Sequence, residues 1–357
     1  MAEIRLEGVT KRYGDLVALD KIDLTIESAS FTSVFGPPGS GKSVLLRVLL
    51  GLEPVDEGRI LIDGLDMTGS APNARNLGMV FQNLALFPHL TSRDNIAFPM
   101  RRKKMAEREI DRRIDDLAGV LSIGHILHKK PGALSGGERQ RVAISRALIR
   151  DAAAYLMDEP IAALDARLRD DMRVELKRLQ SELGKTFIYV THDCDEAMSV
   201  ADTMVILEKG RIAQIGRPDT IYADPRSIHV AEAVGSPRIN VLQGQRRKEG
   251  LECSFGTLPF LATLESKTTI EAETCTIALR PESVRLHDPD AEPKCRGRIV
   301  DVERLGAFAI VTVREGADEI RAVTPGDTAV AVGEIVGLTV DLEGILLFDP
   351  RVGDRIN

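Results

Sequence analysis

Gly36 to Ser43, with the sequence GPPGSGKS, is the segment whose residue types and spacing most directly suggest chemistry. It fits the pattern G-x-x-x-x-G-K-[ST], in which glycines let the backbone curl until its N–H groups point at phosphate oxygens. Lys42 would reach the β- and γ-phosphates of a nucleotide, and the hydroxyl of Ser43 would bind Mg²⁺. The segment lies between an apolar strand and an apolar helix, which favours a phosphate-binding loop over a purely structural glycine turn.

Two acids follow an apolar run in AAYLMDEP and supply the partner that such a loop needs. Asp158 would hold the metal, usually through a water molecule, and Glu159 would orient or polarise the water that attacks the γ-phosphate. Either acid alone would be unremarkable, since Asp-Glu pairs occur on many exposed surfaces. The apolar run before them and the phosphate loop upstream together predict a catalytic pair.

His192 and Gln82 directly follow two further apolar runs, TFIYVT and LGMVF. A lone histidine is more often structural than catalytic, but the polar segment HDCDEA that begins at His192 favours a functional role. Gln82 taken alone is a loop glutamine, whereas at a strand end its side chain could reach Mg²⁺ or the attacking water. Both residues are therefore candidate functional residues at strand ends.

A second segment that could contact an anion, LSGGERQR, runs from Leu134 to Arg141. Ser135 can cap the helix that follows while Glu138 bonds back to the Ser135 backbone, so the simplest interpretation is a capping box. A helix N-terminus also attracts anions, but an exposed contact of this kind contributes only ~0.3 to 1 kcal/mol, against the ~8 kcal/mol of micromolar affinity. The segment therefore cannot bind a nucleotide by itself, and any phosphate that it contacts must be held elsewhere.

The elements that must position these residues alternate along the first part of the chain. Four apolar runs are predicted strands, and each ends beside a polar candidate residue, as expected where ligands gather at the carboxyl ends of parallel strands. These runs are FTSVF before Gly36, LGMVF before Gln82, AAYLM before Asp158 and TFIYVT before His192. Residues 84–150 are predicted to form a helical subdomain, because apolar side chains recur there at helical spacing, as in Ile110, Ile114, Leu117 and Leu121.

After about residue 235 the chain changes to short Val-rich and Ile-rich runs that alternate with polar residues and are broken by glycine and proline. Alternation with a period of two is typical of half-buried strands, so this part predicts a small β domain, either a barrel or a sandwich. We therefore predict an α/β domain over residues 1–235 and an all-β domain over residues 236–357.

Composition and charge exclude several classes of protein. The chain has 357 residues, 43% apolar and 28% charged, and its formal net charge of −7 gives no general attraction for nucleic acid, so no nucleic-acid partner is predicted. The one compact basic run, Arg101 to Lys104, is either a solvated helix face or a partner contact.

The four cysteines lack metal-ligand or disulfide spacing, which fits a reducing cytosol. The N-terminal residues lack a signal-peptide core and no apolar run reaches spanning length, so we expect a protein that docks on a membrane without crossing it.

In order and in letters these motifs resemble those of the ATP-binding-cassette (ABC) ATPases. The order runs from the phosphate loop through Gln82, the signature LSGGERQ, the acids in YLMDE and the loop AALD that ends at Asp165, to His192. The resemblance implies an α/β P-loop NTPase cassette, with a mixed sheet core and a helical subdomain, that binds ATP and Mg²⁺. The catalytic residues would be Glu159, His192 and Gln82, and the metal ligands would be Ser43, Gln82 and Asp158.

The same resemblance implies a set of residues that bind ATP within one cassette. Tyr13 would stack on adenine with Ala18 nearby, the alternative being an aromatic loop residue that fills a surface gap. The full set would be Tyr13, Ala18, Gly36, Pro37, Pro38, Gly39, Ser40, Gly41, Lys42, Ser43 and Val44. Two positions depart from the usual letters of the family: Val44 removes a possible side-chain contact to the α-phosphate, and Cys194 replaces a commoner glutamine.

The resemblance also assigns a role to the second anion-binding segment. Two cassettes of the family pair head to tail, so that Ser135, Gly136, Gly137 and Asp165 of one close over the nucleotide held by the other. The partners implied are a second ATPase subunit, most simply a second copy of this chain, two transmembrane permease subunits and, indirectly, an extracytoplasmic solute-binding protein. The location implied is the cytoplasmic face of the cell (inner) membrane, as a peripheral protein.

The C-terminal segments GSPRINVLQG, IALRPESVRL and LLFDPRVGDRI resemble the OB-like regulatory β domain of carbohydrate-importer ATPases of the maltose-transporter type. This resemblance implies uptake of a sugar, polyol or sugar derivative. Importers of sulfate, polyamines and ferric ion carry related extensions and stay as alternatives. A non-transport cassette ATPase and a nucleotide-gated regulator are the remaining alternatives.

Overall fold

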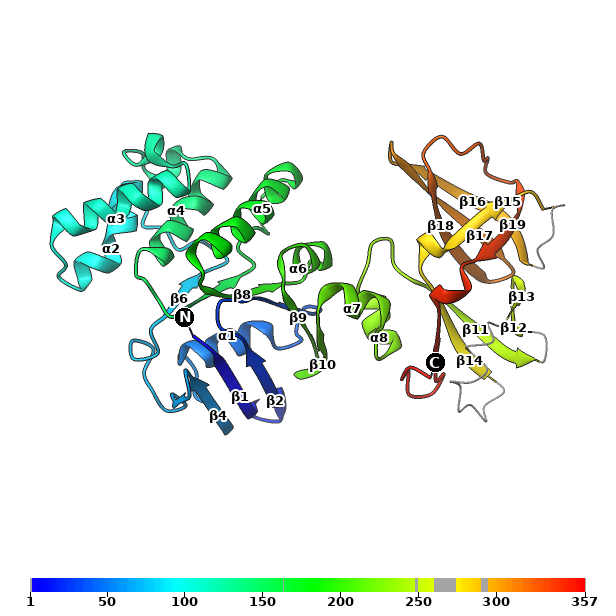
Figure 1. Cartoon of the computed structure of the whole chain (residues 1–357), viewed down its shortest axis with the longest axis horizontal. Coiled ribbons are helices and arrows are strands. Elements are labelled where there is room, and N and C mark those ends of the chain that lie inside the picture. The colour runs from blue at the N-terminus through cyan, green and yellow to red at the C-terminus, as the bar shows by residue number, and fades with distance from the viewer. Residues whose placement is uncertain (1, 163, 248–249, 260–273, 290–294, 357) are drawn as a thin grey trace. The chain divides into compact units, whose positions relative to one another are not determined.

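The computed structural model describes residues 2–162, 164–247, 250–259, 274–289 and 295–356. The chain divides into two compact units, Met1–Pro218 and Asp219–Asn357, which run from blue to green and from green to red in Figure 1. This division lies close to two short helices, α7 (Pro218–Ala223) and α8 (Ile228–Ala233), whereas the sequence changes character only after them. The domain boundary at residue 235 stays a prediction.

The centre of the first unit is a mixed six-stranded sheet in the order β10-β9-β3-β8-β7-β6. Its strands are β3 (Phe31–Phe35), β6 (Leu77–Val80), β7 (Ala154–Asp158), β8 (Thr186–Thr191), β9 (Thr203–Glu208) and β10 (Arg211–Gly216). Strands β9, β3, β8, β7 and β6 pair in parallel, and β10 pairs antiparallel with β9. Every residue of β3 and β8 is buried, because other elements of the unit cover both faces of this sheet. The four strands predicted from apolar runs are therefore confirmed.

A second, antiparallel sheet of the first unit has the order β2-β1-β4-β5. Its strands are β1 (Ile4–Tyr13), β2 (Leu16–Ile26), β4 (Glu57–Ile62) and β5 (Leu65–Asp66). Burial alternates along β2, so one face of this sheet turns inward and packs with helix α1 (Lys42–Leu50) in a single hydrophobic core. This packing holds the phosphate-loop helix between the two sheets.

The remaining helices of the first unit include a layer of three, drawn in cyan to green at one end of this unit in Figure 1. The layer contains α2 (Ser92–Arg102), α3 (Glu107–Val120) and α4 (Gly136–Leu148), with short 3-10 turns at Gly124–Ile126 and Pro131–Ala133, and it is followed in the chain by α5 (Ala166–Leu183) and α6 (Cys194–Val200). The predicted stripe on α3 turns inward, since Ile110, Ile114 and Leu121 are fully buried. The helical character predicted for this part of the cassette is confirmed.

The second unit is built on one connected antiparallel sheet of ten strands. They are β11 (Asn240–Arg247), β12 (Gly250–Cys253), β13 (Gly256–Leu258), β14 (Thr274–Leu279), β15 (Val284–His287), β16 (Cys295–Arg304), β17 (Phe308–Glu315), β18 (Asp318–Pro325), β19 (Ile335–Val340) and β20 (Ile345–Phe348), with 3-10 turns at Pro281–Ser283 and Leu342–Gly344. Buried Arg280 donates to the carbonyls of Tyr222, Ala231 and Val234, which ties α7 and α8 to this sheet. The predicted all-β C-terminal domain is confirmed.

Candidate nucleotide site

The phosphate loop spans the gap between the carboxyl end of β3 and the start of α1, as its sequence predicts. Gly41 caps α1 with a φ of 107°, in the left-handed region where side chains are strained, and a Cβ there would lie 2.6 Å from the carbonyl oxygen of Ala18. A Cβ on Gly36 would lie 2.2 Å from the carbonyl oxygen of Leu207. Only glycine fits at either position, because the loop backbone passes close to its neighbours there.

Lys42 belongs to the phosphate-loop motif and is also the first residue of helix α1. Its Nζ donates hydrogen bonds to the carbonyls of Gly36 at 2.8 Å and Pro37 at 2.9 Å. Burial lowers the pKa of Lys42, while the nearby carboxylates of Glu159 and Asp158 act in the opposite direction. The ammonium group thus stands at the phosphate loop with two acids close enough to influence its charge.

Asp158 is the last residue of β7, and Glu159 follows it at the carboxyl edge of the sheet. Burial raises the pKa of Asp158, and the negative charge of Glu159 raises it further. Glu159 has a φ of 43°, an uncommon backbone conformation for a residue with a side chain, and its N–H donates to the carbonyl of Val190 at 2.9 Å.

Gln82, Glu159 and His192 meet in one hydrogen-bonded group. The Gln82 Nε2 donates to Glu159 Oε2 at 3.1 Å, and His192 Nδ1 lies 2.9 Å from Glu159 Oε1. The three residues come together because β6, β7 and β8 are adjacent and parallel, so their carboxyl ends share one edge. The structure therefore places all three candidate catalytic side chains within contact distance, with the carboxylate between the amide and the imidazole.

Ser135 begins helix α4 with the predicted capping box. Its Oγ accepts from the Glu138 N–H at 3.2 Å, and Glu138 Oε2 accepts from the Ser135 N–H at 2.7 Å. The backbone hydrogen bond from Ser135 lowers the pKa of Glu138. Among the described residues, no hydrogen bond joins Ser135, Gly136 or Gly137 to the phosphate loop of the same chain. The capping box is confirmed, and the signature segment is free of the nucleotide loop in its own chain.

Asp165 caps helix α5 in the same way as Ser135 caps α4. Its Oδ1 accepts from the Leu168 N–H at 3.0 Å. Leu168 also packs against Gly137, where a Cβ would lie 2.7 Å from a Leu168 methyl carbon, so the two candidate trans segments are neighbours. Ala163, in the loop before Asp165, lies outside the described residues.

Tyr13 ends strand β1 with its side chain 43% exposed, available to a ligand. Its hydroxyl donates to Glu53, and Lys11 Nζ lies 5.4 Å from the centre of its ring. Ala18 lies on β2 with its carbonyl beside Gly41, as noted above. Ala18 therefore borders the phosphate loop from the antiparallel sheet, and the adenine contact of Tyr13 stays a prediction.

Two charged residues near this site were not predicted from the sequence. Arg75 is buried and donates to the carbonyls at the end of α1, and Glu196 is buried beneath the segment that carries His192. The capping pattern Asp193 to Glu196 was a signal for the second, since the Asp193 carboxylate accepts from the Glu196 N–H at 3.0 Å. Nothing in the local sequence distinguished Arg75 from a surface arginine.

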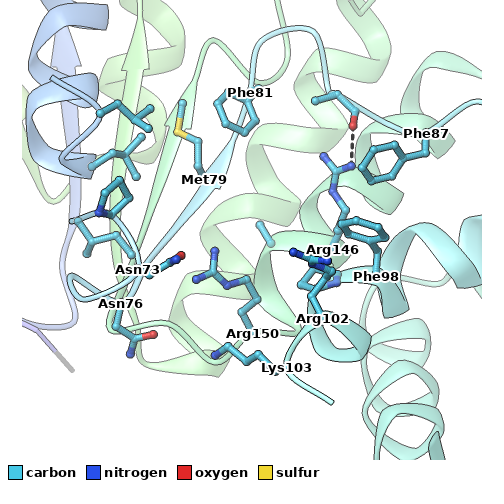
Figure 2. Close-up of a pocket in the computed structure, with 17 residues that line it drawn as sticks. Asn73, Asn76, Met79, Phe81, Phe87, Phe98, Arg102, Lys103, Arg146 and Arg150 are labelled. Carbon is cyan, nitrogen blue, oxygen red and sulfur yellow. Dashed lines mark hydrogen bonds between the residues drawn. The ribbon is translucent and has the colours of Figure 1, made fainter. Parts of the chain in front are cut away.

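A separate cavity of about 670 Å³ lies between β6, the loop after it, and helices α2 and α4. Figure 2 shows the guanidinium groups of Arg102, Arg146 and Arg150 around it, with Phe81, Phe87 and Phe98 supplying apolar walls. Arg146 is held in place because it donates to the carbonyls of Ala85 at 2.6 Å and Leu84 at 2.7 Å. The cavity thus combines aromatic walls with positively charged groups.

Comparison with known proteins decides the family. The model of the ABC transporter family matches residues 19–162, and that of the TOBE domain matches residues 277–348. The sn-glycerol-3-phosphate import ATP-binding protein of Rhizobium johnstonii is 38% identical over 354 residues, which cover 99% of this chain and 96% of that protein. The chain belongs to the ABC transporter ATP-binding proteins. This cassette is therefore an ATPase, and the predicted resemblance is confirmed.

Further relatives agree with this assignment. The maltose/maltodextrin import ATP-binding protein of Vibrio parahaemolyticus is 37% identical over 365 residues, covering 100% of this cassette chain and 98% of that protein. Among solved structures, a dimeric bacterial ABC transporter cassette has a TM-score of 0.55 and 32% identity, covering 60% of this chain and 98% of that one. A post-hydrolysis state of an ATP-binding cassette bound to ADP and Pi has a TM-score of 0.54 and 32% identity, covering 60% of this chain and 98% of that one. Within the described residues, no helix combines the length and the apolar composition needed to cross a bilayer.

Proposed function

We propose that this cassette hydrolyses ATP to power the import of a sugar, polyol or sugar derivative through a membrane complex. The observation that carries the proposal is the Glu159 carboxylate, held between Gln82 and His192 at the sheet edge beside the phosphate loop. Relatives that match over the whole chain are import ATP-binding proteins for maltose/maltodextrin and for sn-glycerol-3-phosphate, which are a sugar and a phosphorylated polyol. Sulfate, polyamine and ferric ion are the alternative solutes.

ATP would bind with its phosphates in the loop from Gly36 to Ser43. Lys42 Nζ would exchange its two backbone carbonyl partners for β- and γ-phosphate oxygens, a gain because a charged donor then meets a charged acceptor. Ser40 Oγ is buried with no hydrogen-bond partner among the described residues, so a phosphate oxygen would satisfy it. The Tyr13 ring would stack on the adenine.

The residues present fit a Mg²⁺ ion bound with ATP. Mg²⁺ prefers oxygen ligands, and Ser43, Gln82 and Asp158 offer a hydroxyl, an amide oxygen and a carboxylate. The described residues hold no cluster of three or more acids, histidines or cysteines suited to a metal, so the nucleotide oxygens would complete the set. Burial disfavours the charged form of Asp158, and a cation would relieve that cost. When bound, the ion would neutralise charge on the phosphates.

Glu159 would accept a proton from, or orient, the water that attacks the γ-phosphate. Its carboxylate is fixed on both oxygens, by the Gln82 amide and by His192 Nδ1. Because the carboxylate can only accept, His192 donates from Nδ1, and its Nε2 would contact the γ-phosphate as a second donor in the imidazolium form. The two flanking side chains thus set the direction of the base without removing its charge.

The second copy of this chain would complete the site in trans. Ser135, Gly136 and Gly137 begin a helix whose N-terminus favours negative charge, by only ~0.3 to 1 kcal/mol. Such a contact becomes useful when the phosphate is already held by the partner's loop. The dimeric state of a similar solved cassette supports this arrangement.

The cavity shown in Figure 2 is where we propose that a permease subunit docks, on the cytoplasmic face of the membrane. It opens on the loop from Gln82 to Leu90, which connects the candidate catalytic glutamine to α2. Its aromatic walls and its cations, Arg102, Lys103, Arg146 and Arg150, would suit an amphipathic segment that carries acids. Motion at Gln82 would reach the permease through this loop. The extracytoplasmic solute-binding protein would act on the permeases and not on this chain.

Replacing Glu159 by glutamine tests the proposed function. The carbonyl of the introduced amide can accept from Gln82 while its NH₂ donates to His192 Nδ1 in the tautomer protonated at Nε2. Both contacts can therefore form, the second with its direction reversed, while the basicity of the carboxylate is lost. We expect ATP affinity within about threefold of wild type and a turnover roughly 10²- to 10⁴-fold lower. Steady-state phosphate release and equilibrium ATP binding by the full chain measure the two quantities.

The matched control is Glu182→Gln, an exposed glutamate on α5 that pairs with Arg178 and should leave both quantities unchanged. Wild-type turnover in the Glu159 variant would disprove its assignment as the base. Co-purification of the full chain with two membrane proteins, followed by ATP-dependent uptake of a sugar or polyol into vesicles, tests the importer role. A complex that takes up sulfate, a polyamine or ferric ion instead would correct the solute.

A further inference from the structure

Glu196, on helix α6, is a carboxylate that the proposed chemistry does not use, yet it is only 2% exposed. A buried carboxylate is costly unless hydrogen bonds and an opposite charge compensate it. Glu196 Oε2 accepts from the hydroxyl of Tyr189 at 2.9 Å and from the hydroxyl of Thr191 at 2.7 Å. Burial and the negative charge of Glu196 raise the pKa of Tyr189, so this phenol remains a donor. The acid is therefore built into the end of strand β8, directly before His192.

Glu196 also contacts the residues on both sides of His192, with its carboxylate on the Thr191 side and its backbone N–H on the Asp193 side. The Thr191 hydroxyl, which donates to Glu196, accepts from the Asp193 N–H at 3.0 Å, and the Asp193 carboxylate accepts from the Glu196 N–H at 3.0 Å. His192 itself is half exposed, and the one hydrogen bond of its ring described here is that to Glu159. The imidazole is thus carried by a short segment whose flanking side chains are both hydrogen-bonded to Glu196, Thr191 to its carboxylate and Asp193 to its backbone N–H.

Arg169, on helix α5, supplies positive charge to this group. Its Nε lies 3.6 Å from Glu196 Oε1, and its Nη1 lies 3.8 Å from Asp193 Oδ2. Its Nη2 donates to the carbonyl of Leu164 at 3.1 Å, directly before Asp165. One guanidinium therefore contacts the segment that carries His192 and the segment that ends at Asp165, the residue expected to face the partner's nucleotide.

We propose that Glu196 and Arg169 are positioning residues: Glu196 holds the backbone from which His192 reaches Glu159, and Arg169 joins that backbone to the segment ending at Asp165. The inference rests on the proposed function, since it takes His192 and Asp165 as contacts of the nucleotide in cis and in trans. Its consequence is that a second copy of this chain, closing on Asp165, alters the position of His192 in the first. Turnover is thereby coupled to dimer closure through two residues that do not touch ATP.

Glu196→Gln tests the first half. The glutamine carbonyl still accepts from Tyr189 and Thr191, so the variant removes the charge that attracts Arg169 and keeps the shape. A misplacement of about 1 Å at a catalytic group can lower the rate roughly 100-fold, so we expect kcat for ATP to fall roughly 10- to 100-fold with KM within about twofold. The exposed variant Glu182→Gln is the control. A merely structural role predicts no such separation of kcat from KM, and a kcat within twofold of wild type overturns the proposal.

Arg169→Met tests the second half of the proposal. It also serves if the Glu196 variant fails to fold, because Arg169 is partly exposed and methionine replaces its apolar stem while removing the guanidinium. We expect the same loss of kcat at unchanged KM. In single-turnover measurements, Asp165→Ala and Glu196→Gln should be non-additive in wild type and additive in the Arg169→Met background. Additivity in both backgrounds overturns the coupling.

His192→Ala and Glu159→Gln are measured beside these variants. If both keep wild-type turnover, the proposed function fails. If both lose turnover while Glu196→Gln and Arg169→Met do not, the positioning role alone fails.

Discussion

Replacing Arg75 by methionine tests how far the phosphate-loop helix depends on a buried arginine at its C-terminal end. Arg75 is 3% exposed and lies just before β6, the strand that leads to Gln82. Its guanidinium donates to two carbonyls of α1 and two of the loop that follows β5: those of Val48 at 2.7 Å, Leu49 at 2.8 Å, Thr68 at 2.8 Å and Ser70 at 3.1 Å. The last carbonyls of a helix have no partner within it. The Gly51 N–H donates to the Val48 carbonyl at 3.1 Å, so the Leu49 carbonyl is the helix acceptor that depends on Arg75.

The expected loss of stability follows from the burial of these acceptors. The carbonyls of Val48 and Leu49 are buried, whereas the bonds to Thr68 and Ser70 are partly open to water, which can replace the arginine there. The Leu49 carbonyl, left unsatisfied, costs ~1 to 3 kcal/mol, whereas the Val48 carbonyl keeps its hydrogen bond from the Gly51 N–H. Burial lowers the pKa of Arg75, because the charged guanidinium loses hydration there, and methionine avoids that desolvation cost. We therefore expect the free energy of unfolding to fall by about 1 to 3 kcal/mol.

Urea denaturation of the full chain, followed by far-UV circular dichroism, measures this loss. The transition of the first unit is the one that added ATP should shift. Arg59→Met is the control, because that arginine pairs with Glu7 at the surface with 64% of its side chain exposed and should contribute less than about 1 kcal/mol. A loss below about 1 kcal/mol for the Arg75 variant would refute the reasoning, since it would mean that water reaches the helix carbonyls.

The remaining predictions concern the two anion-binding segments. Lys42→Ala removes the ammonium group at the phosphate loop, and we expect equilibrium ATP binding to weaken by roughly 10- to 100-fold, the effect of about one to two charge-assisted hydrogen bonds; an unchanged dissociation constant would contradict the assignment. Ser135→Arg places a bulky cation at the start of α4, and we expect unchanged ATP binding to the isolated chain but loss of turnover and of the ATP-bound dimer in size-exclusion chromatography. Turnover that survives this change would mean that the segment is a helix cap only.

Much of the cassette followed from local sequence because the deciding interactions are local. The glycines of the phosphate loop, the helix that begins at Lys42, and the capping box of Ser135 and Glu138 each depend on residues a few positions apart. Strands β3, β6, β7 and β8 were predicted because burial on both faces requires a continuous apolar run. The predicted sheet edge likewise followed, since each polar candidate stands where such a run ends.

The contacts of Arg75 and Glu196 did not follow, because their partners are set by packing. Arg75 acts on α1, far from it in the chain, and a sequence gives no sign of which helix end an arginine will meet. Glu196 resembled the solvated acids around it in HDCDEA, and only the position of α6 against β8 buries it beneath Thr191. The left-handed backbone of Glu159 was equally hidden, since side chains rarely adopt it and its hydrogen bond to Val190 comes from the neighbouring strand.

The sequence by itself determined that this chain is an ABC-type ATPase with a separate β domain, because its motifs encode backbone shapes within short segments and occur in an order typical of one family. The tertiary structure decided how those motifs act on one another. The order β8-β7-β6 brings His192, Glu159 and Gln82 to one edge, and the packing of α5 beside α6 joins Arg169 to Glu196. Distances between side chains that are remote in the chain arise from strand order and helix packing, which depend on the whole core and not on any one segment.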